Sequence, residues 1–379
     1  MAQAKPKAPS RPGIRRLGRI FVRLAKAALL AVLLAAAWSA GFIALRCYGD
    51  GGSPRAAATV ERPGPDIPGY QREESFTFLS LPQWSIVYSS AEYGKTIAAQ
   101  PPSAFPYAGS VRQYWRYYDA ACRATKDTYP FTAGDHLMLG VMGSSFSIEY
   151  ALKGFYENSF GGLAQWISGH DTPEDALART TAAEYAAFMR NAPWYEFPFG
   201  TRLNALWRET PARGPHMVRK WERRLALTTE FGVKAATGWL IGLGRGGPSG
   251  QEGARIHARI EGARPGIYAD GVVKKVRGAG TGAIVTLPRY EAFTARMIVL
   301  LQQGVRFVDI AGNDAILVTV LAPVSWSPSD LEASLVLDEP LLTAADLRRV
   351  ALKVPVRVLH VVVPQIRVGG ARVEHIYDY

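Results

Sequence analysis

The hydropathy pattern of the chain is dominated by one uninterrupted apolar run near the N-terminus. Residues 27–45 are nineteen consecutive positions without a charge, bounded by Lys26 and Arg46. A helix rises 1.5 Å per residue, so this run predicts a helix of roughly 28 Å, close to the hydrocarbon thickness of a bilayer. Because a helix satisfies its own backbone hydrogen bonds, the run is expected to cross a membrane.

The charges around this run predict its orientation. Eight cations precede the run, no acidic residue occurs in the first 49 positions, and Arg46 alone follows closely. The positive-inside rule then places residues 1–26 in the cytoplasm, as a basic tail, and the bulk of the chain outside the inner membrane. A cleaved secretory signal is the alternative, with residues 35–37 as its small-residue site. A retained anchor is favoured because the apolar run continues for eight residues beyond Ala37.

Small residues recur along the apolar run with a spacing of four. Such a stripe lets two membrane helices approach closely, so it makes a homodimer through the transmembrane helix a candidate assembly. The alternative is an alanine-rich helix without a helical partner. The principal stripe consists of Ala27, Ala31, Ala35 and Ser39.

The next two segments are a tether and an aromatic-rich helical domain. Residues 46–69 are rich in Gly and Pro and predict a tether able to hold the folded part away from the membrane, and residues 70–243 form the domain. An aromatic and β-branched stretch at 76–90 predicts a short strand, a break at Pro82 and a turn or helix start near Gln83. Thr172, Pro173 and Asp175 predict a capping box at a helix start. Helical periodicity covers residues 111–126, 136–157, 171–190, 202–208 and 215–243.

The glycine-rich stretch 244–253 predicts a linker to a smaller α+β domain at 254–379. From residue 255 the periodicity changes from 3.6 to 2. Thr343 and Asp346 predict a capping box for a helix that runs to Lys353. The order of elements matches a ferredoxin-like α+β sandwich with additional strands. Strands are predicted at 255–261, 283–287, 305–310, 315–321, 335–337, 356–363 and 371–377, and a helix at 290–303.

The formal charge of +12 does not indicate nucleic-acid binding. The first 46 residues hold nine of the 44 Lys and Arg and none of the 32 acids, which leaves 35 − 32 = +3 on the remainder. The basicity therefore belongs to the tail, where it suits anionic lipid headgroups. Nucleic acid is excluded as the main partner, and the membrane is retained as one.

The chain has two cysteines, Cys47 and Cys122, which have no metal-type spacing. Outside the cytoplasm they could form a disulfide, but a separation of 75 residues says nothing about proximity. Two unpaired thiols are the favoured interpretation.

Catalytic and binding motifs were sought by their chemistry. The glycine-rich stretches lack the Lys of a phosphate loop, residues 143–147 do not form a nucleophile elbow, and the six histidines are dispersed. No cofactor or metal is predicted. Glu149 and Glu157 are a candidate carboxylate pair for acid–base chemistry. With Lys153 between them at helical spacing, a salt-bridge ladder along one helix is favoured.

Aromatic residues are concentrated in the helical domain. They could line a groove for an apolar ligand or form a compact core, and the core is favoured. The turn at 194–197 is the first choice for a ligand-binding site, because loops held by a scaffold often carry function. Its members are Trp194, Tyr195, Glu196 and Phe197.

These patterns together predict a single-pass, membrane-anchored envelope protein with a non-cytoplasmic ectodomain. The expected function is binding of a partner protein or an apolar ligand. The alternative is a membrane-anchored envelope hydrolase that uses carboxylates of the helical domain.

Overall fold

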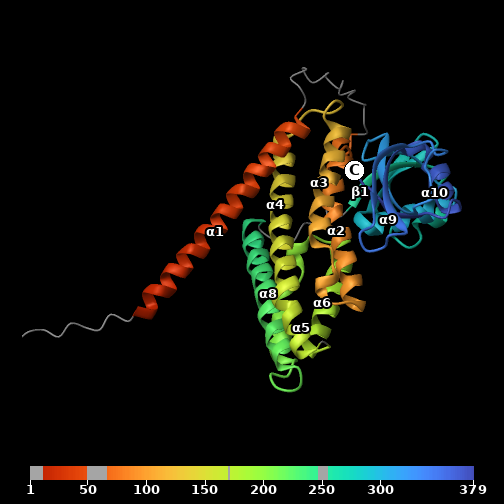
Figure 1. Cartoon of the computed structure of the whole chain (residues 1–379). Coiled ribbons are helices and arrows are strands. Elements are labelled where there is room, and N and C mark those ends of the chain that lie inside the picture. The colour runs from red at the N-terminus through yellow and green to blue at the C-terminus, as the bar shows by residue number, and fades with distance from the viewer. Residues whose placement is uncertain (1–11, 49–65, 170, 246–254) are drawn as a thin grey trace, which may run out of the picture.

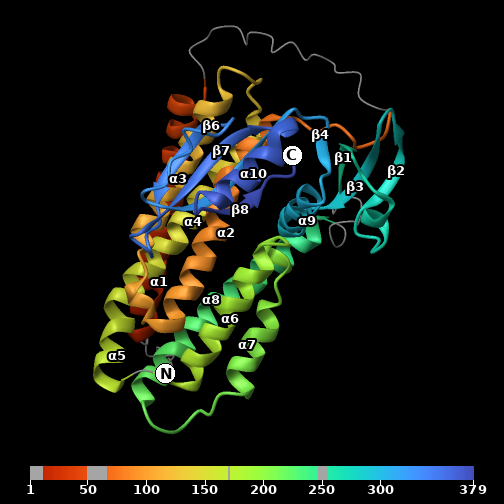
Figure 2. The ribbon, with the colours of Figure 1, turned by 90° about the vertical axis from the view of Figure 1, so that its right-hand side faces the viewer.

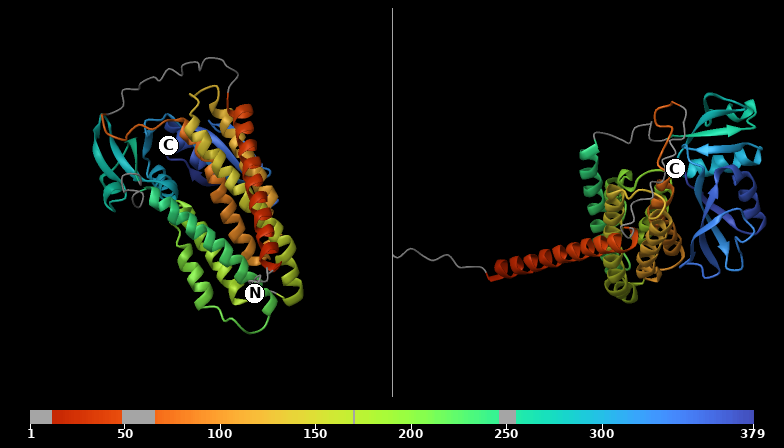
Figure 3. Two further views of the ribbon diagram at one scale, coloured as in Figure 1. Left: turned by 90° about the vertical axis from the view of Figure 1, so that its left-hand side faces the viewer. Right: turned by 90° about the horizontal axis from the view of Figure 1, so that it is seen from above.

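The fold comprises a long N-terminal helix, a bundle of helices and an α+β unit (Figure 1). A computed structural model describes residues 12–48, 66–169, 171–245 and 255–379. Residues 1–11 of the predicted tail and most of the predicted tether and linker therefore lie outside the described residues, whereas residues 12–26 of the tail belong to α1. Helix α1 leaves the bundle obliquely, and the α+β unit lies on the bundle's far side from it (Figure 3).

The helices of the first part follow one another with short connections. Two π-helical turns, Ile43–Cys47 and Glu157–Gly161, continue α1 and α4, and a 3₁₀ turn at Trp194–Glu196 precedes α7. The α-helices are α1 (Pro12–Phe42), α2 (Ser75–Ala99), α3 (Tyr107–Thr125), α4 (Ala133–Tyr156), α5 (Gly162–Ser168), α6 (Pro173–Met189), α7 (Phe199–Arg208) and α8 (Met217–Arg245).

Helix α2 replaces the short strand predicted before Pro82, and Pro82 lies inside the helix rather than breaking it. Of the two alternatives predicted near Gln83, a turn or a helix, the helix is present. The sequence misled because α2 is the central helix of the fold, buried on almost every side. Such a helix is apolar all round and loses its 3.6-residue signature. By contrast, the predicted start of α6 is confirmed: Thr172 and Asp175 form the reciprocal capping box, with Pro173 in the first turn.

Helix α1 contains an apolar segment, Leu29–Cys47, which is the single membrane-span candidate among the described residues. Only 6% of this segment is buried, which is unlike the core helix of a water-soluble domain. Its length and apolarity suit a membrane anchor or a signal sequence.

The C-terminal end of α1 packs directly on the bundle. The Ser39 hydroxyl donates to the Gly140 carbonyl of α4 at 3.2 Å, and Phe42 lies 5.0 Å, centroid to centroid, from Trp115 of α3. The Ser39 end of the small-residue stripe thus meets α4 of the same chain. The expectation that a tether separates the anchor from the folded part is wrong, because α1 is itself part of the packing.

The α+β unit consists of two four-stranded antiparallel sheets, ordered β2-β3-β1-β4 and β6-β7-β5-β8. Each is made by the same succession of three strands, one helix and one strand, so the topology occurs twice. The first comprises β1 (Arg255–Glu261), β2 (Lys274–Ala279), β3 (Gly282–Pro288), α9 (Tyr290–Gln302) and β4 (Arg306–Ile310), and the second β5 (Ala315–Pro323), β6 (Ser334–Pro340), β7 (Leu347–Pro355), α10 (Leu359–Val368) and β8 (Arg372–Ile376).

The α+β class is confirmed, but the finer ferredoxin-like arrangement is wrong. Residues 347–355 form strand β7 instead of the helix predicted from Thr343 and Asp346, and most of 356–363 is helical instead of extended. Strand β7 pairs on both sides within its sheet, so tertiary pairing overrides the local capping signal. Strand β2 was not predicted, because its residues are almost all exposed and show no alternation of apolar and polar side chains.

One apolar core joins the bundle to both sheets. It contains Phe78 and Trp84 of α2, together with the inner faces of β1, β3, β5 and β7. The second sheet lies over α2 and α3 (Figure 2). The Trp84 ring stacks on His375 of β8 at 3.6 Å, and the buried His375 has its pKa well below the ordinary value because burial penalises its cation.

A buried arginine of β7 fixes the sheet to the bundle. The Arg349 guanidinium donates to Glu92 of α2 at 3.1 Å and to Glu374 of β8 at 2.9 Å. It also lies 4.0 Å from the centre of the Tyr88 ring. Burial raises the pKa of Glu92, an effect that Arg349 opposes. Removing the cation would therefore leave two buried carboxylates unpaired.

We expect Arg349→Met to lower the free energy of unfolding by about 3–5 kcal/mol, the usual cost of breaking a buried ion pair from one side. Urea unfolding of the full chain in detergent, followed by tryptophan fluorescence, measures this loss. Arg372→Met, at an exposed position of β8, is the matched control and should change stability by less than about 0.5 kcal/mol. Equal effects of the two substitutions would contradict the assignment.

Candidate functional site

The turn at 194–197 closes the end of the bundle rather than opening onto a cavity. Phe197 is buried in an apolar cluster with Phe199 and Phe231. The Tyr195 carbonyl approaches α8 so closely that a Cβ added at Gly238 would lie 2.7 Å from it. The four predicted ligand-binding residues of this turn do not line the bundle cavity described below. The turn is therefore packed against the bundle, with Phe197 as its buried residue.

The carboxylates of α4 pair with α8. Glu149 meets Lys234 at 2.9 Å, Lys153 meets Glu230 at 2.9 Å, and Glu157 accepts two bonds from Arg223, each of 2.9 Å. The favoured ladder along α4 is wrong, because this face of the helix packs against an antiparallel neighbour of complementary charge. We call these three pairs the α4–α8 ion-pair row.

A small cavity adjoins this row. Its volume is about 60 Å³, and helices α2, α4, α6, α7 and α8 enclose it. Glu149 and Lys153 lie at its edge, and Tyr93, Tyr150 and Tyr185 contribute rings. The Thr181 hydroxyl, which also lines it, has no hydrogen-bond partner among the described residues. A site of this size holds a few water molecules, each needing about 10–15 Å³ of such volume, but not a lipid.

The pKa values of two charged groups at the cavity, Glu230 and Lys153, lie far from neutral pH. Burial by itself would raise the pKa of Glu230, but Lys153 and Lys234 overcome it and lower that pKa to about 2. Burial opposes the cation of Lys153, yet Glu230 keeps the pKa of this lysine above its ordinary value. General acid–base catalysis requires a pKa near the working pH. This site provides fixed charges instead of exchangeable protons.

A group of buried cations on α8 begins with Arg223 of the ion-pair row and extends toward the N-terminus of the helix. Helix α8 directs four cations inward, all almost completely buried: Arg219, Lys220, Arg223 and Arg224. Arg219 meets Asp175 at 2.8 Å, and Arg224 meets Glu174 at 2.9 Å. Asp175 therefore caps α6 and neutralises α8 at once. The sequence prediction named only carboxylates and omitted these cations, although their spacing places them on one face of the helix.

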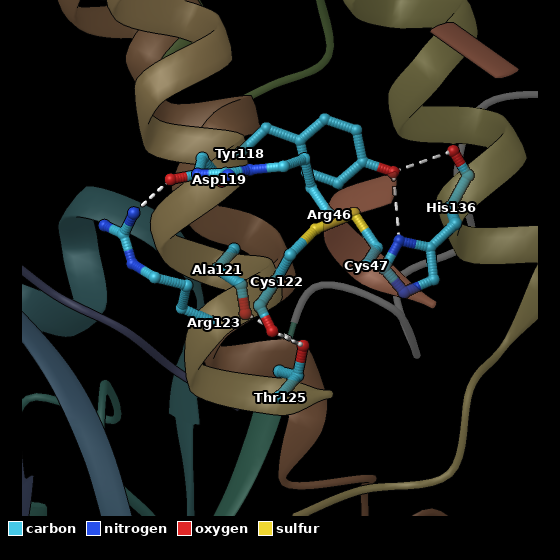
Figure 4. The surroundings of a disulfide bond; sticks show 9 residues. All are labelled: Arg46, Cys47, Tyr118, Asp119, Ala121, Cys122, Arg123, Thr125 and His136. Atoms are coloured by element: carbon cyan, nitrogen blue, oxygen red, sulfur yellow. Dashed lines mark hydrogen bonds and ion pairs between the residues drawn. A yellow bond between two sulfur atoms is a disulfide. The ribbon is translucent and has the colours of Figure 1, made fainter. Parts of the chain in front are cut away.

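The two cysteines form a disulfide that ties α1 to α3, with a Cα–Cα distance of 4.6 Å (Figure 4). The favoured expectation of two unpaired thiols is wrong, because packing of α1 on the bundle brings the two cysteines together in space although 75 residues separate them in sequence. His136 of α4 lies beside the sulfurs, and its Nδ1 is 2.9 Å from the Tyr118 hydroxyl. Cysteine binds metals as thiolate, so the bonded sulfurs are not thiolate ligands.

No protein-family model, no curated protein and no solved structure matches the chain. The interpretation of function therefore rests on geometry and physical chemistry.

We expect the disulfide to be present in the full chain. Neither cysteine should react with a maleimide until the protein is reduced and unfolded. Cys122→Ser should lower the free energy of unfolding by about 4.5 kcal/mol, as expected for a loop closed over a separation of 75 residues. Cys47→Ser and the double variant should lose the same amount, because all three lack one and the same bond. Additive losses in the double variant would contradict the pairing.

The lowered pKa of Glu230 predicts an acid-dependent loss of stability. The charged carboxylate stabilises the fold above its ordinary pKa of 4.5, and this contribution is lost as the pH falls toward about 2. Glu230→Gln should be less stable than wild type by about 2–3 kcal/mol near neutrality, with the difference shrinking below pH 4.5. Denaturant unfolding across pH measures it. A difference independent of pH would contradict the prediction.

Proposed function

We propose that the protein is a single-pass, membrane-anchored protein of the cell envelope whose ectodomain binds a partner protein. The N-terminus lies in the cytoplasm, and the bundle and α+β unit lie outside the inner membrane. The role is non-enzymatic, and binding takes place on the exterior of the ectodomain.

The anchor is supported by α1. Its apolar segment is almost entirely uncovered by the rest of the chain, and a helix with so much exposed apolar surface needs a lipid or protein environment. The cations before the segment favour the cytoplasmic side for the N-terminus. Packing of its C-terminal end on α4 and the bond to Cys122 support retention of the segment, because a cleaved signal would have no use for either contact.

The non-enzymatic role is carried by one observation: the carboxylates nominated for acid–base chemistry are committed to ion pairs. Glu157 is buried with Arg223 on both oxygens, and Glu149 is paired with Lys234. The adjoining Glu230 has a lowered pKa and Lys153 a raised pKa, so both groups stay charged near neutral pH and serve as ion-pair partners. This arrangement favours a scaffold over the alternative of an envelope hydrolase.

A partner protein is favoured over an apolar ligand by size. Pockets for small molecules usually enclose about 300–1,000 Å³, whereas the bundle cavity is about 60 Å³. A macromolecular partner needs no cavity, because protein interfaces form between complementary outer surfaces. A homodimer through α1 remains a separate prediction, in which the partner protein is a second copy of the chain.

An impermeant amine-reactive crosslinker, added to spheroplasts that express the tagged full chain, tests location and binding together. We expect modification of ectodomain lysines from outside and a discrete crosslinked species of higher mass. Lys275, exposed on the edge strand β2, offers a reactive amine.

Glu149→Gln provides the control for the hydrolase alternative. The crosslinked species should persist in this variant, because Glu149 is assigned to a structural pair. Protection of the whole chain from the impermeant reagent would contradict the orientation. Modification without any discrete species would contradict partner binding.

A further inference from the structure

Helix α8 has the polarity opposite to that of a helix at a water-exposed surface. Every charged side chain from Arg219 to Lys234 points into the bundle or is half-buried, and none is exposed. Most outward positions are apolar instead, and the exposed Thr229 and Thr237 donate their hydroxyls to carbonyls of the same helix. They include Val218, Trp221, Leu225, Val233, Leu240 and Leu243, each about half exposed or more.

Exposed apolar side chains continue onto the neighbouring α4 and α5, and Glu149 of α4 is an exposed charge among them. Trp166 is 83% exposed, which is extreme for the largest apolar side chain. Contiguous exposed apolar patches beyond a few hundred Å² mark interaction or membrane sites. The outward residues here include Leu137, Val141, Leu152, Phe155, Leu163 and Trp166. We call the outward residues of α4, α5 and α8 the apolar face.

The outward positions of α6 and α7 differ. Thr180, Ala183 and Glu184 of α6 and Asn204 of α7 are exposed and are polar or small, whereas Trp207 of α7 is an exposed aromatic exception. The bundle is therefore amphipathic as a whole, with one polar surface and one apolar face. A protein surrounded by water has no physical reason for this division.

The apolar face lies on the side of the bundle from which α1 departs. In the view from above, α8 and α1 occupy one side and the α+β unit the opposite side (Figure 3, right). Helix α1 touches the face directly, because Ser39 packs on Gly140 between the outward residues of α4. Any bilayer that surrounds α1 thus adjoins this face.

Two exposed tryptophans, Trp221 and Trp239, belong to the outward side of α8. Tryptophan is enriched where the hydrocarbon of a bilayer meets the headgroups. Their exposure therefore suits a face that lies along this boundary.

We propose that the apolar face of α4, α5 and α8 lies against the phospholipid acyl chains beside α1. The ectodomain then rests against the bilayer, with the buried charges of α8 shielded inside the bundle and the α+β unit directed away from the lipid. This inference rests on the membrane anchoring proposed above. It adds that α1 is not the only lipid-contacting element.

Lipid is favoured over a second copy of the chain by continuity with α1. A membrane-crossing α1 already brings acyl chains to the contact between Ser39 and Gly140, whereas a second copy would first have to displace them. The apolar face also exposes no charged side chain of α8 that could orient a protein partner.

Depth-dependent quenching of the full chain in phospholipid nanodiscs tests this inference. Single cysteines replace Leu152 and Leu225 on the face, Thr180 and Asn204 on α6 and α7, and Leu33 in α1. Each carries a nitrobenzoxadiazole label attached under non-reducing conditions, which leave the native disulfide intact. Nanodiscs with and without brominated acyl chains are compared, and circular dichroism verifies that each variant is folded.

Labels at Leu152 and Leu225 should emit at shorter wavelength and lose most of their emission in brominated lipid, like the label at Leu33. Labels at Thr180 and Asn204 should not respond. Quenching at Leu33 without quenching at Leu152 and Leu225 overturns the inference and leaves the anchor intact. If such discs hold two chains, a second copy covers the face. Absence of quenching at Leu33 overturns the anchoring itself, and the inference with it.

Discussion

The structure depends on neutralising the cations of α8 inside the bundle. An unpaired buried charge costs several kcal/mol, so Arg219, Arg223 and Arg224 require carboxylates at close range. Those carboxylates come from α6 and from the end of α4, which fixes both elements against α8. Because the charged positions of α8 are directed inward, most of its large apolar side chains face outward, and Leu227 and Phe231 are the buried exceptions. The exposed apolar side chains of α8 are therefore a consequence of the burial of its cations.

A second buried cation performs the corresponding task between the bundle and the sheets. Arg349 joins Glu92 of α2 to Glu374 of β8, and the aromatic rings around it exclude water. The α+β unit is thereby fixed to α2 and α3, while α1 is fixed to α3 and α4 by packing and a disulfide. These attachments orient the α+β unit relative to α1.

Part of the fold and little of the candidate site could be predicted from the sequence. The apolar run of α1 and the capping box of α6 depend on neighbours within a turn or two, so they could be read locally and are present in the structure. Helix α2 and strand β7 could not, because burial on every side and pairing with distant strands set their conformation. Glu149 and Glu157 were recognised as important side chains, but their partners on α8 lie more than sixty residues away.

By itself, the sequence determined the apolar segment, its cationic flank and the helical and mixed character of the two parts, because composition and local periodicity suffice for these. Tertiary structure alone decided that Cys47 bonds to Cys122, that α4 pairs with α8 instead of with itself, and that one βββαβ arrangement occurs twice. Each of these depends on which surfaces meet in space. The free energy of burying a charge or an apolar face depends on the surface that covers it, and no local sequence pattern specifies that surface.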